Sequence, residues 1–285
     1  MTNAPAPINA LTDEAWHEVV KRSLTERAFE GVELPGFPPA EVQERFVGAS
    51  YERALDEAFN FYTAIKRAVA EHGGGLGDDS RVLDFGVGWG RILRYFLKDV
   101  PETGLYGLDA MPLAIDLCKQ IGCPGSLVHG AQLPPSVFAA DSFDVVYAYS
   151  VFSHLSERAQ LAWVEELGRV LRPGGLLVVT SRSDYFLSYV EQLDGRREQL
   201  AGHEEQLLAT FPDLPQVRAR YEAGEFVFVP YATGGGGGGL DEELYGEAFV
   251  PRAYAERVWG ERLAFRGFTD DPAQLPQSVI VLQKQ

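Results

Sequence analysis

Apolar residues recur along this chain with two different periods. Over residues 11–30 and 41–71 they return at roughly helical spacing, as Trp16, Val20 and Leu24 do in the first stretch. From residue 79 onwards, short runs of consecutive apolar residues alternate with amphipathic stretches. Consecutive apolar residues are typical of strands buried on both faces of a parallel sheet. The pattern therefore predicts helices first and then a β/α core.

The individual elements follow from this pattern and from the turn residues between them. The first region should contain helices over residues 11–30 and 41–71, separated by residues 35–39, with a break at residues 48–50. Strands are expected at residues 82–84, 104–109, 126–129, 141–150, 176–180, 225–231, 263–268 and 278–282. Helices are expected at residues 91–97, 112–120, 157–171 and 251–259, and residues 186–220 should be mostly helical.

A glycine-rich turn joins the first of these strands to a helix. Asp84 ends the strand, and Gly86, Gly88 and Gly90 follow at alternate positions before the amphipathic stretch 91–97. Glycine allows a positive φ and lets a ligand lie against bare main chain. The N-terminus of the following helix would add free N–H groups and the positive end of its dipole. The unit predicts a site for a polar ligand at the carboxyl end of a parallel sheet.

The spacing of the glycines indicates which ligand this is. A dinucleotide fingerprint, Gly-x-Gly-x-x-Gly, would place its third glycine at position 91, which is arginine. The observed Asp-x-Gly-x-Gly-x-Gly resembles motif I of the class I S-adenosylmethionine (SAM) methyltransferases. In that family the turn passes beneath the methionine half of SAM, and the resemblance implies that Asp84 helps to hold the methionine amino group. A glycine-rich turn without a ligand is the alternative.

A second carboxylate, Asp109, follows about 20 residues after the turn, at the end of the apolar run 104–109. A Rossmann-like unit places an acid there that accepts hydrogen bonds from ribose hydroxyls. The alternative role of Asp109 is to cap the helix 112–120. On the resemblance, Asp109 and the two residues after it, Ala110 and Met111, are expected to bind the cofactor.

The third strand of the family is followed by residues that contact adenine, frequently through an aspartate and an adjacent backbone N–H. In this chain His129 stands at the position expected for the aspartate. The resemblance assigns His129, Gly130 and Ala131 to the cofactor site, with backbone N–H groups as donors. A purely structural role for His129 is an equal alternative.

The end of the fourth strand is the second place where the resemblance implies chemistry. The run 141–150 resembles the family's fourth strand, whose carboxyl end lies next to the glycine turn in an open α/β sheet. Tyr149 and Ser150 are expected to border the cofactor's methionine, and Phe152 and His154 to face the acceptor. An imidazole can act as a general base near neutral pH, which makes His154 the candidate catalytic residue. A helix cap or a bond to a loop carbonyl is the alternative for His154.

Residues 170–180, Val-Leu-Arg-Pro-Gly-Gly-Leu-Leu-Val-Val-Thr, strongly resemble the family's segment before and through its fifth strand. Glycine ends the preceding helix, and proline prevents the helix from continuing. Because both motifs occur in the right order and separation, the resemblance covers residues 79–182 and, more weakly, 251–283.

Further segments flank or interrupt this core. Residues 1–10 are expected to be a disordered tail, and residues 11–75 a helical cover. Within the cover, residues 46–50 and the pair Phe61 and Tyr62 resemble parts of a lid across the SAM pocket, with an aromatic core as the alternative. The SAM-binding core would then span residues 76–285.

An insertion at residues 183–250 departs from a minimal methyltransferase and is expected to serve as an acceptor lid. Its six consecutive glycines, residues 234–239, predict a mobile loop that is either part of the lid or a surface linker. Candidate acceptor-pocket residues in and beside it are Tyr185, Tyr231, Tyr245 and Arg252, each of which also suits a structural role.

Composition narrows the choice of partners. The 285-residue chain has a formal net charge of −16, which argues against a nucleic-acid acceptor because phosphates require a basic surface. There is no transmembrane run of roughly 18 apolar residues and no N-terminal signal pattern, so a cytoplasmic protein without membrane contact is expected. Cys118 and Cys123 are read as reduced thiols; two cysteines alone cannot form a four-ligand zinc site, no pair of histidines lies near them, and no metal is expected.

These patterns together lead to one expectation and two alternatives. We expect an α/β three-layer sandwich with a seven-stranded, mostly parallel sheet, as in Rossmann-like methyltransferases. The expected activity is SAM-dependent methylation of an oxygen or nitrogen on a small molecule, with S-adenosylhomocysteine as product, by a monomer or homodimer. One alternative is a non-catalytic SAM-binding protein. The other, a nucleotide-dependent oxidoreductase, is disfavoured by Arg91 in place of glycine.

Overall fold

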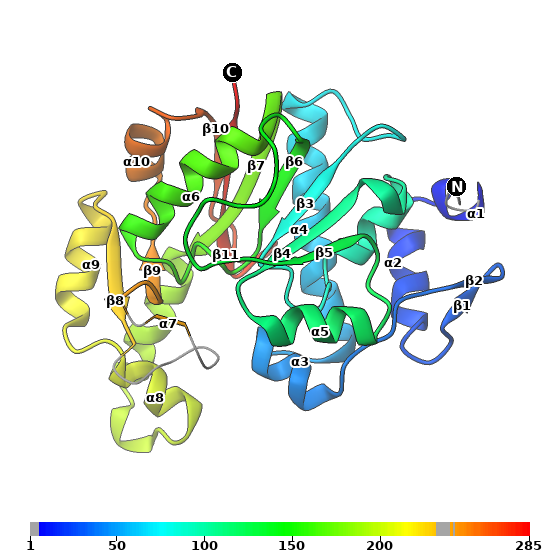
Figure 1. The fold of residues 1–285 in the computed structure, drawn as a ribbon. Coiled ribbons are helices and arrows are strands. Elements are labelled where there is room, and N and C mark those ends of the chain that lie inside the picture. The colour runs from blue at the N-terminus through cyan, green and yellow to red at the C-terminus, as the bar shows by residue number, and fades with distance from the viewer. Residues whose placement is uncertain (1–5, 232–239, 242) are drawn as a thin grey trace. The chain divides into compact units, whose positions relative to one another are not determined.

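The computed structural model describes residues 6–231, 240–241 and 243–285 (Figure 1). The chain forms two compact units, which are described in turn. The first contains the residues up to 131, with residues 136–148 and 170–176. The second contains residues 132–135, 149–169 and 177–285.

The first unit is built on four parallel strands. These are β3 (Val82–Phe85), β4 (Leu105–Asp109), β5 (Ser126–His129) and β6 (Phe143–Ala148). β3 lies between β4 and β6, and β5 pairs with the outer side of β4. The register places Asp84 opposite Gly107 on one side and Tyr147 on the other. The carboxyl ends of these strands therefore meet at one edge, as the apolar pattern predicts.

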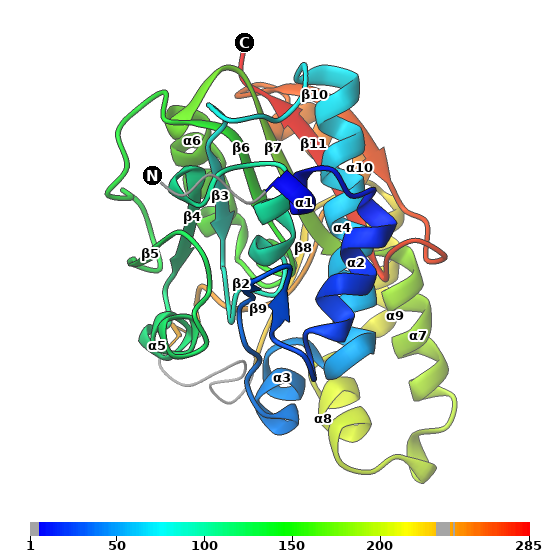
Figure 2. The same cartoon turned by 90° about the vertical axis from the view of Figure 1, so that its right-hand side faces the viewer.

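Helices complete the first unit. They are α1 (Ala6–Asn9), α2 (Asp13–Arg22), α3 (Ala40–Val47), α4 (Tyr51–His72) and α5 (Pro112–Gln120), with the short 3₁₀ helices η1 (Leu93–Lys98) and η2 (Glu102–Gly104). α2 packs along α4 (Figure 2). The expected break at residues 48–50 is confirmed, because Gly48 ends α3 in the left-handed conformation with φ 70°.

Three expectations for this unit are corrected. The helix expected over residues 11–30 ends at Arg22, and the chain then forms a hairpin of β1 (Ala28–Phe29) and β2 (Val32–Glu33). Both residues at its tip, Glu30 and Gly31, have positive φ, which a helix cannot accommodate. The expected disordered tail, residues 1–10, is structured in part. Residues 6–9 form α1 because Ile8 has a core position, with 2% of its surface exposed.

The third correction concerns the segment after the glycine turn. An amphipathic α-helix over residues 91–97 was the expectation, but the segment is the 3₁₀ helix η1, and residues 91–96 are all buried. The two arginines that suggested a polar face point inward. Arg91 donates to the Ala54 carbonyl and to Glu57, and Arg94 donates to the carbonyls of Pro35 and Gly36. The unit therefore lacks the α-helix N-terminus that was expected to face a ligand.

The second unit contains α6 (Glu157–Val170) over most of its length and the end of β7 (Leu171–Arg182). The last two strands, β10 (Ala264–Thr269) and β11 (Gln277–Gln283), form the expected antiparallel hairpin. A short helix α10 (Arg252–Tyr254), continued by a π-helical turn η4 (Ala255–Trp259), precedes that hairpin where one helix is expected.

Residues 183–250 have a hydrophobic core of their own. The segment contains α7 (Asp184–Asp194), η3 (Arg197–Gln199), α8 (His203–Ala209), α9 (Leu214–Glu222), β8 (Val227–Pro230) and β9 (Gly246–Phe249). Buried side chains from α7, α8, α9 and both strands pack together around Phe249. β8 pairs antiparallel with β9, and Phe249 of β9 pairs with Arg182 of β7. The six-glycine stretch lies outside the described residues.

Strand β7 runs through both units, and hydrogen-bonded strands follow the order β10-β11-β7-β6-β3-β4-β5. This is the expected seven-stranded, mostly parallel sheet with an antiparallel final strand. β8 and β9 extend it to nine strands, and β9 is an element that the apolar pattern does not reveal.

Candidate active site

The glycine turn after β3 is held against the end of β4. Gly86 and Val87 donate their backbone N–H groups to the Leu108 carbonyl at 2.7 and 3.1 Å. Gly86, Gly88 and Gly90 have φ values of 84°, 55° and 72°, so each occupies a conformation that favours glycine. The structure therefore supports the expected turn, with bare main chain at the carboxyl end of β3.

Contacts beneath the turn explain why position 90 has no side chain. A Cβ atom on Gly90 would lie 2.1 Å from Sγ of Cys123. The Cys118 thiol donates to the Gly88 carbonyl at 3.3 Å, so both buried cysteines pack under the turn. On Gly88 a Cβ would meet only the Phe46 ring, at 3.6 Å. Phe46 belongs to the segment expected to cover the turn, and its position supports that proposal.

Asp109 bonds to the main chain with both oxygens. Its Oδ2 accepts from the Gly88 N–H at 2.9 Å, and its Oδ1 accepts from the Met111 N–H, next to α5, at 2.8 Å. Burial raises the pKa of this carboxyl, while the N–H bonds from Met111 and Gly88 oppose the shift. A carboxylate has about four acceptor positions, and the N–H of Ala110 is a third backbone donor, so about one position remains for a hydroxyl donor. The capping role and the proposed ribose contact are therefore compatible.

Asp84 is a buried acid, with 2% of its surface exposed, that has no cation bonded to it in the described structure. The Tyr147 hydroxyl donates to its Oδ2 at 2.9 Å. Burial, reinforced by the neighbouring Asp109 carboxylate, raises the pKa of Asp84 to about 8 despite the tyrosine bond. A ligand ammonium close to the turn would favour the ionised acid, mainly through its charge, since little of the carboxyl surface is accessible.

Among the other residues of the first unit that were predicted to bind the cofactor, His129 and Ala131 are exposed. Nε2 of His129 lies 3.2 Å from the Ala110 carbonyl oxygen. The Gly130 N–H donates to the Asp109 carbonyl at 2.9 Å, which leaves the Ala131 N–H as the proposed adenine donor.

Tyr62, which was also predicted to bind the cofactor, lies in the core. Its side chain is fully buried, and its hydroxyl donates to Asp99 and Asp13. Its ring stacks on Tyr95 at a centroid distance of 5.4 Å. Because it has no exposed surface, the expectation that Tyr62 contacts the cofactor is corrected to a core role, the alternative raised by its aromatic neighbours.

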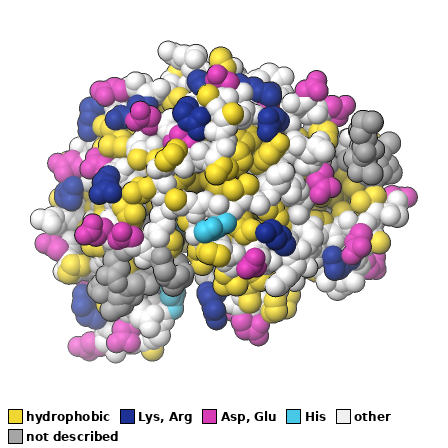
Figure 3. Space-filling view, in the orientation of Figure 1, with side chains coloured by type: hydrophobic (Ala, Val, Ile, Leu, Met, Phe, Trp, Pro, Cys, Tyr) yellow, Lys and Arg dark blue, Asp and Glu magenta, His cyan; other side chains and the backbone are white. Residues whose placement is uncertain are grey.

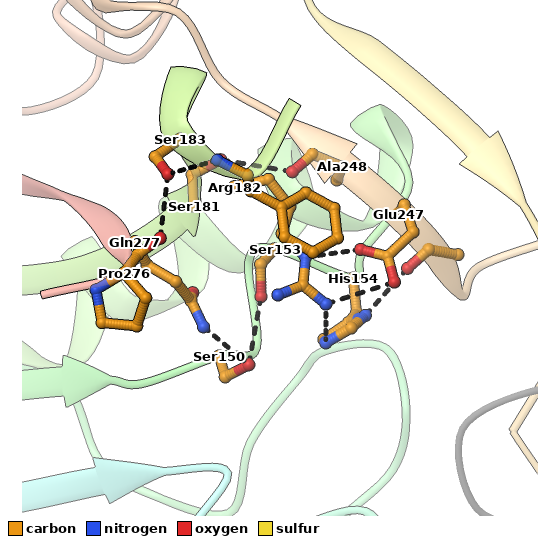
Figure 4. Close-up of polar contacts among 12 residues, drawn as sticks. Ser150, Ser153, His154, Ser181, Arg182, Ser183, Glu247, Ala248, Pro276 and Gln277 are labelled. Atoms are coloured by element: carbon orange, nitrogen blue, oxygen red, sulfur yellow. Dashed lines mark hydrogen bonds and ion pairs between the residues drawn. The ribbon is translucent and has the colours of Figure 1, made fainter. Parts of the chain in front are cut away.

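In the second unit, polar side chains gather where β6, β7 and β9 lead into loops (Figure 4). His154 follows β6, Arg182 ends β7, and Glu247 lies in β9. The Arg182 guanidinium forms a two-pronged ion pair with the buried Glu247 carboxylate, with one N···O distance of 3.1 Å. The Tyr231 hydroxyl also donates to Glu247. These contacts make the cluster a rigid polar surface.

His154 uses both ring nitrogens within this cluster. Nδ1 lies 2.9 Å from the Gly246 carbonyl, and Nε2 lies 3.5 Å from Nη2 of Arg182. Tyr245 stacks on the imidazole at a centroid distance of 5.0 Å. Burial, together with the positive charge of Arg182, lowers the pKa of His154 to about 4 despite Glu247. The neutral imidazole thus donates to a carbonyl and faces a cation, a geometry that suits orientation better than proton removal.

Arg182 and Glu247 carry no signal in the sequence that distinguishes them from other charged residues. They lie 65 positions apart, and Glu247 belongs to the strand that the apolar pattern misses. Only the position of Arg182 directly after an apolar run could have indicated it, since residues at the carboxyl ends of parallel strands face ligand sites.

Three of the predicted acceptor residues lie elsewhere. Phe152 is fully buried against Trp259, with ring centroids 5.5 Å apart, which corrects its expected position in the acceptor pocket to the core. Tyr185 is 52% exposed at the start of α7. The Arg252 side chain is 63% exposed and 3.9 Å from Glu256 on the next helical turn. Only Tyr231 and Tyr245 join His154, while Tyr149 and Ser150 lie just before it in the chain.

Charged side chains of both signs are interspersed on one face of the molecule (Figure 3). Within the described ranges, no cluster of His, Cys, Asp and Glu is arranged to hold a metal ion. None of the helices there is both long and apolar enough to cross a membrane.

Comparisons with known proteins place the glycine turn in a family. Residues 82–175 match a family model described as a methyltransferase domain. Malonyl-[acyl-carrier protein] O-methyltransferase from Paenibacillus sp. (strain JDR-2) is 25% identical over 154 residues. That match covers 50% of this chain and 55% of the relative, so the chain spans about half the length of this relative.

Solved structures share the fold. A SAM-dependent methyltransferase of the DUF858 family from Leishmania major has a TM-score of 0.54 at 13% identity, covering 99% of this chain and 88% of its own. The PH0226 protein from Pyrococcus horikoshii has a TM-score of 0.50 at 15% identity, covering 85% of this chain and 95% of its own. The matched domain contains the glycine turn, Asp84 and Asp109, whose two carboxylates and bare main chain suit the ammonium and ribose of SAM. Residues 82–175 therefore match a methyltransferase domain, and the fold is the Rossmann-like fold of SAM-dependent methyltransferases.

Proposed function

We propose that the protein transfers the methyl group of SAM to an oxygen or nitrogen of a small-molecule acceptor. The observation that carries the proposal is the glycine turn, fixed to β4 by Asp109, above the buried acid Asp84. SAM, when bound, supplies a methyl group on a positively charged sulfur. The chain's task is then to align the acceptor with that methyl group and to exclude water.

In this proposal the first unit holds the cofactor. Asp109 accepts from the ribose hydroxyls, and Asp84 interacts with the methionine amino group through charge. Ala110, Met111, His129, Gly130 and Ala131 border the nucleoside. Tyr149 and Ser150 are proposed to border the methionine, as the resemblance implies.

An acceptor of small size is supported by charge and by the polar cluster of the second unit. A chain with a net charge of −16 repels nucleic-acid phosphates. His154, Arg182, Tyr231 and Tyr245 offer ring faces and hydrogen-bonding groups at the end of β6 and β7. One relative is named as an O-methyltransferase, an enzyme that methylates an oxygen, and this favours an oxygen nucleophile in the acceptor here. We infer a cytoplasmic monomer or homodimer.

The role proposed for His154 is to position Gly246 and Arg182. Substitution His154→Ala is therefore expected to reduce turnover less than about tenfold, since an essential base contributes roughly 10²- to 10⁴-fold. Turnover would be measured with methyl-labelled SAM, and Tyr185→Ala on the exposed start of α7 serves as the control. A loss above a hundredfold, with SAM affinity unchanged, would show that His154 removes the proton.

The methylation itself is tested by incubating the protein with methyl-labelled SAM and a panel of small hydroxylated, carboxylated and amino acceptors. Label transferred to an acceptor, together with S-adenosylhomocysteine, is the expected result. Cofactor binding without transfer to any acceptor, or slow loss of label to water alone, would favour the non-catalytic SAM-binding alternative.

A further inference from the structure

Ser150 has a backbone conformation that serine rarely adopts. Its φ is 58°, two residues after the end of β6 at Ala148. For a residue with a Cβ, the left-handed region costs on the order of 1–2 kcal/mol, so it persists where the surroundings enforce it. Such strain is common at ligand sites, and Ser150 is the residue that the resemblance places beside the methionine.

A closed ring of three hydrogen bonds enforces this conformation, and Figure 4 shows one of them, between Gln277 and Ser150. The Ser150 N–H donates to Oγ1 of Thr180 at 2.8 Å. That hydroxyl donates to Oε1 of Gln277 at 2.8 Å, and Nε2 of Gln277 donates back to Oγ of Ser150 at 3.0 Å. The ring therefore binds both the main chain and the side chain of Ser150.

Each group in this ring of hydrogen bonds has the donor or acceptor that its bond requires. Thr180 can accept from an N–H and donate to a carbonyl at once because its hydroxyl has both capacities, and glutamine supplies one acceptor and one donor on a planar group. Thr180 is fully buried and Gln277 is 6% exposed, so water does not compete for these bonds. Valine in place of Thr180, or leucine in place of Gln277, would leave buried polar groups without partners.

The ring connects distant elements at one point. Thr180 lies in β7 and Gln277 begins β11, 30 and 127 residues from Ser150. The Ser150 hydroxyl is also 3.4 Å from that of Ser153, and the loop continues directly to His154. Tyr147, three positions before Ser150, bonds to Asp84. The strained residue thus lies on the short segment between the groups proposed to act on the cofactor and on the acceptor.

We propose that Thr180 and Gln277 are positioning residues that hold the backbone of Ser150 in the left-handed conformation needed to bind the methionine end of the cofactor. This inference rests on the proposed function. The proposal concerns the backbone conformation of Ser150 and not its hydroxyl group. It therefore differs from a proposal that Thr180 and Gln277 only stabilise the fold.

Glycine provides the decisive test, because it adopts a positive φ without support. Affinity for S-adenosylhomocysteine is measured by calorimetry on the wild type, Gln277→Leu, Ser150→Gly and the double variant. Gln277→Leu should weaken binding at least about tenfold, a loss of roughly 1.4 kcal/mol. Ser150→Gly should lose less affinity than Gln277→Leu, and adding Gln277→Leu to Ser150→Gly should cause no further loss. Gln274→Leu, at an exposed glutamine close by, is the matched control and should leave affinity unchanged.

Each outcome bears on a separate claim. Wild type that fails to bind would refute the proposed function. Wild type that binds, with Gln277→Leu binding equally well, would overturn the positioning role, as would a double variant no better than Gln277→Leu. If Gln277→Leu does not fold in a thermal melt, Thr180→Ser and Thr180→Val replace it. The serine variant keeps the hydroxyl and should bind like wild type, whereas the nearly isosteric valine should weaken binding; equal affinities would overturn the proposal.

Discussion

Asp84 is a buried acid beside a second carboxylate, Asp109, and both conditions raise its pKa. Its pKa of about 8 means that it holds a proton at neutral pH in the free protein. An ammonium bound near the turn favours the ionised carboxylate, so binding releases a proton whenever Asp84 starts protonated.

We therefore predict that affinity for S-adenosylhomocysteine increases as the pH rises toward about 8, the pKa of Asp84. At still higher pH the ligand's own amino group loses its charge, and affinity should fall. Calorimetry in buffers with different ionisation enthalpies counts the protons released. Asp84→Asn should remove the rise below pH 8, and the same rise in that variant would contradict the role given to Asp84.

Adding a single carbon atom at Gly90 tests how tightly the cysteines pack beneath the glycine turn. Gly90→Ala adds a Cβ 2.1 Å from Cys123 Sγ in a backbone with φ 72°. Gly74→Ala adds one at φ 82° with no atom within 4 Å. The strain alone costs about 1 kcal/mol, and we expect Gly90→Ala to cost at least about 3 kcal/mol of unfolding free energy. Urea unfolding measures both, and equal losses would mean that the cysteines do not constrain the turn.

Among the elements, α2, α4 and η1 are joined by a compact charge network. Nζ of Lys66 lies 2.7 Å from Asp13 and 2.9 Å from Asp99, and Tyr62 donates to the same two carboxylates. The carboxylates of Asp13 and Asp99 are 25% and 11% exposed. The network fixes the N-terminal helices to the segment that follows the glycine turn.

Removing Lys66 takes away the nearest cation of both acids and leaves them with Lys98, whose Nζ lies 2.9 Å from Asp13 and 3.5 Å from Asp99. Lys66→Ala is expected to lower the free energy of unfolding by about 2 kcal/mol. Lys21, paired with the exposed Glu18 one helical turn away, offers the control, and Lys21→Ala should cost less than about 0.5 kcal/mol. Urea denaturation followed by circular dichroism gives both values. Similar losses in the two variants would show that the network does not secure the helices.

The elements also show what the sequence can predict and what it cannot. The strands near Asp84, Asp109 and Tyr147 and the helix α5 were predictable, because their apolar runs and turn residues are local signals. The 3₁₀ form of η1 was not, because Arg91 and Arg94 look like a solvated face until their carbonyl partners on other elements, 37 to 59 residues away, are known.

The same distinction applies to the site. Asp84, Asp109 and the glycines lie in one short motif with recognisable spacing. Arg182 with Glu247, and Ser150 with Gln277, are joined by hydrogen bonds across 65 and 127 positions, and no periodicity links such pairs. His154 was predictable as a site residue but not as one whose two nitrogens are both engaged, because its partners come from β7 and from β9.

At the scale of the whole molecule, the fold and the net charge bear on different parts of the proposed function. A methyltransferase domain carries the cofactor motif, and a net charge of −16 disfavours nucleic acid as the acceptor. Each unit contributes a cluster of its own: the two carboxylates and glycines in the first, and the Arg182 and Glu247 pair with its aromatic neighbours in the second.

The central claim, that the glycine turn holds SAM, is tested most directly by calorimetric titration of the wild-type protein with S-adenosylhomocysteine. We predict saturable binding at one site per chain that Asp109→Ala abolishes. Because Asp109 also fixes Gly88 and Met111, a ligand lacking the ribose 2′-hydroxyl is titrated in parallel. Weaker binding of that ligand to the unaltered protein would show that the ribose 2′-hydroxyl contributes to binding, as the contact proposed for Asp109 requires. No binding of S-adenosylhomocysteine to the wild type would contradict the account.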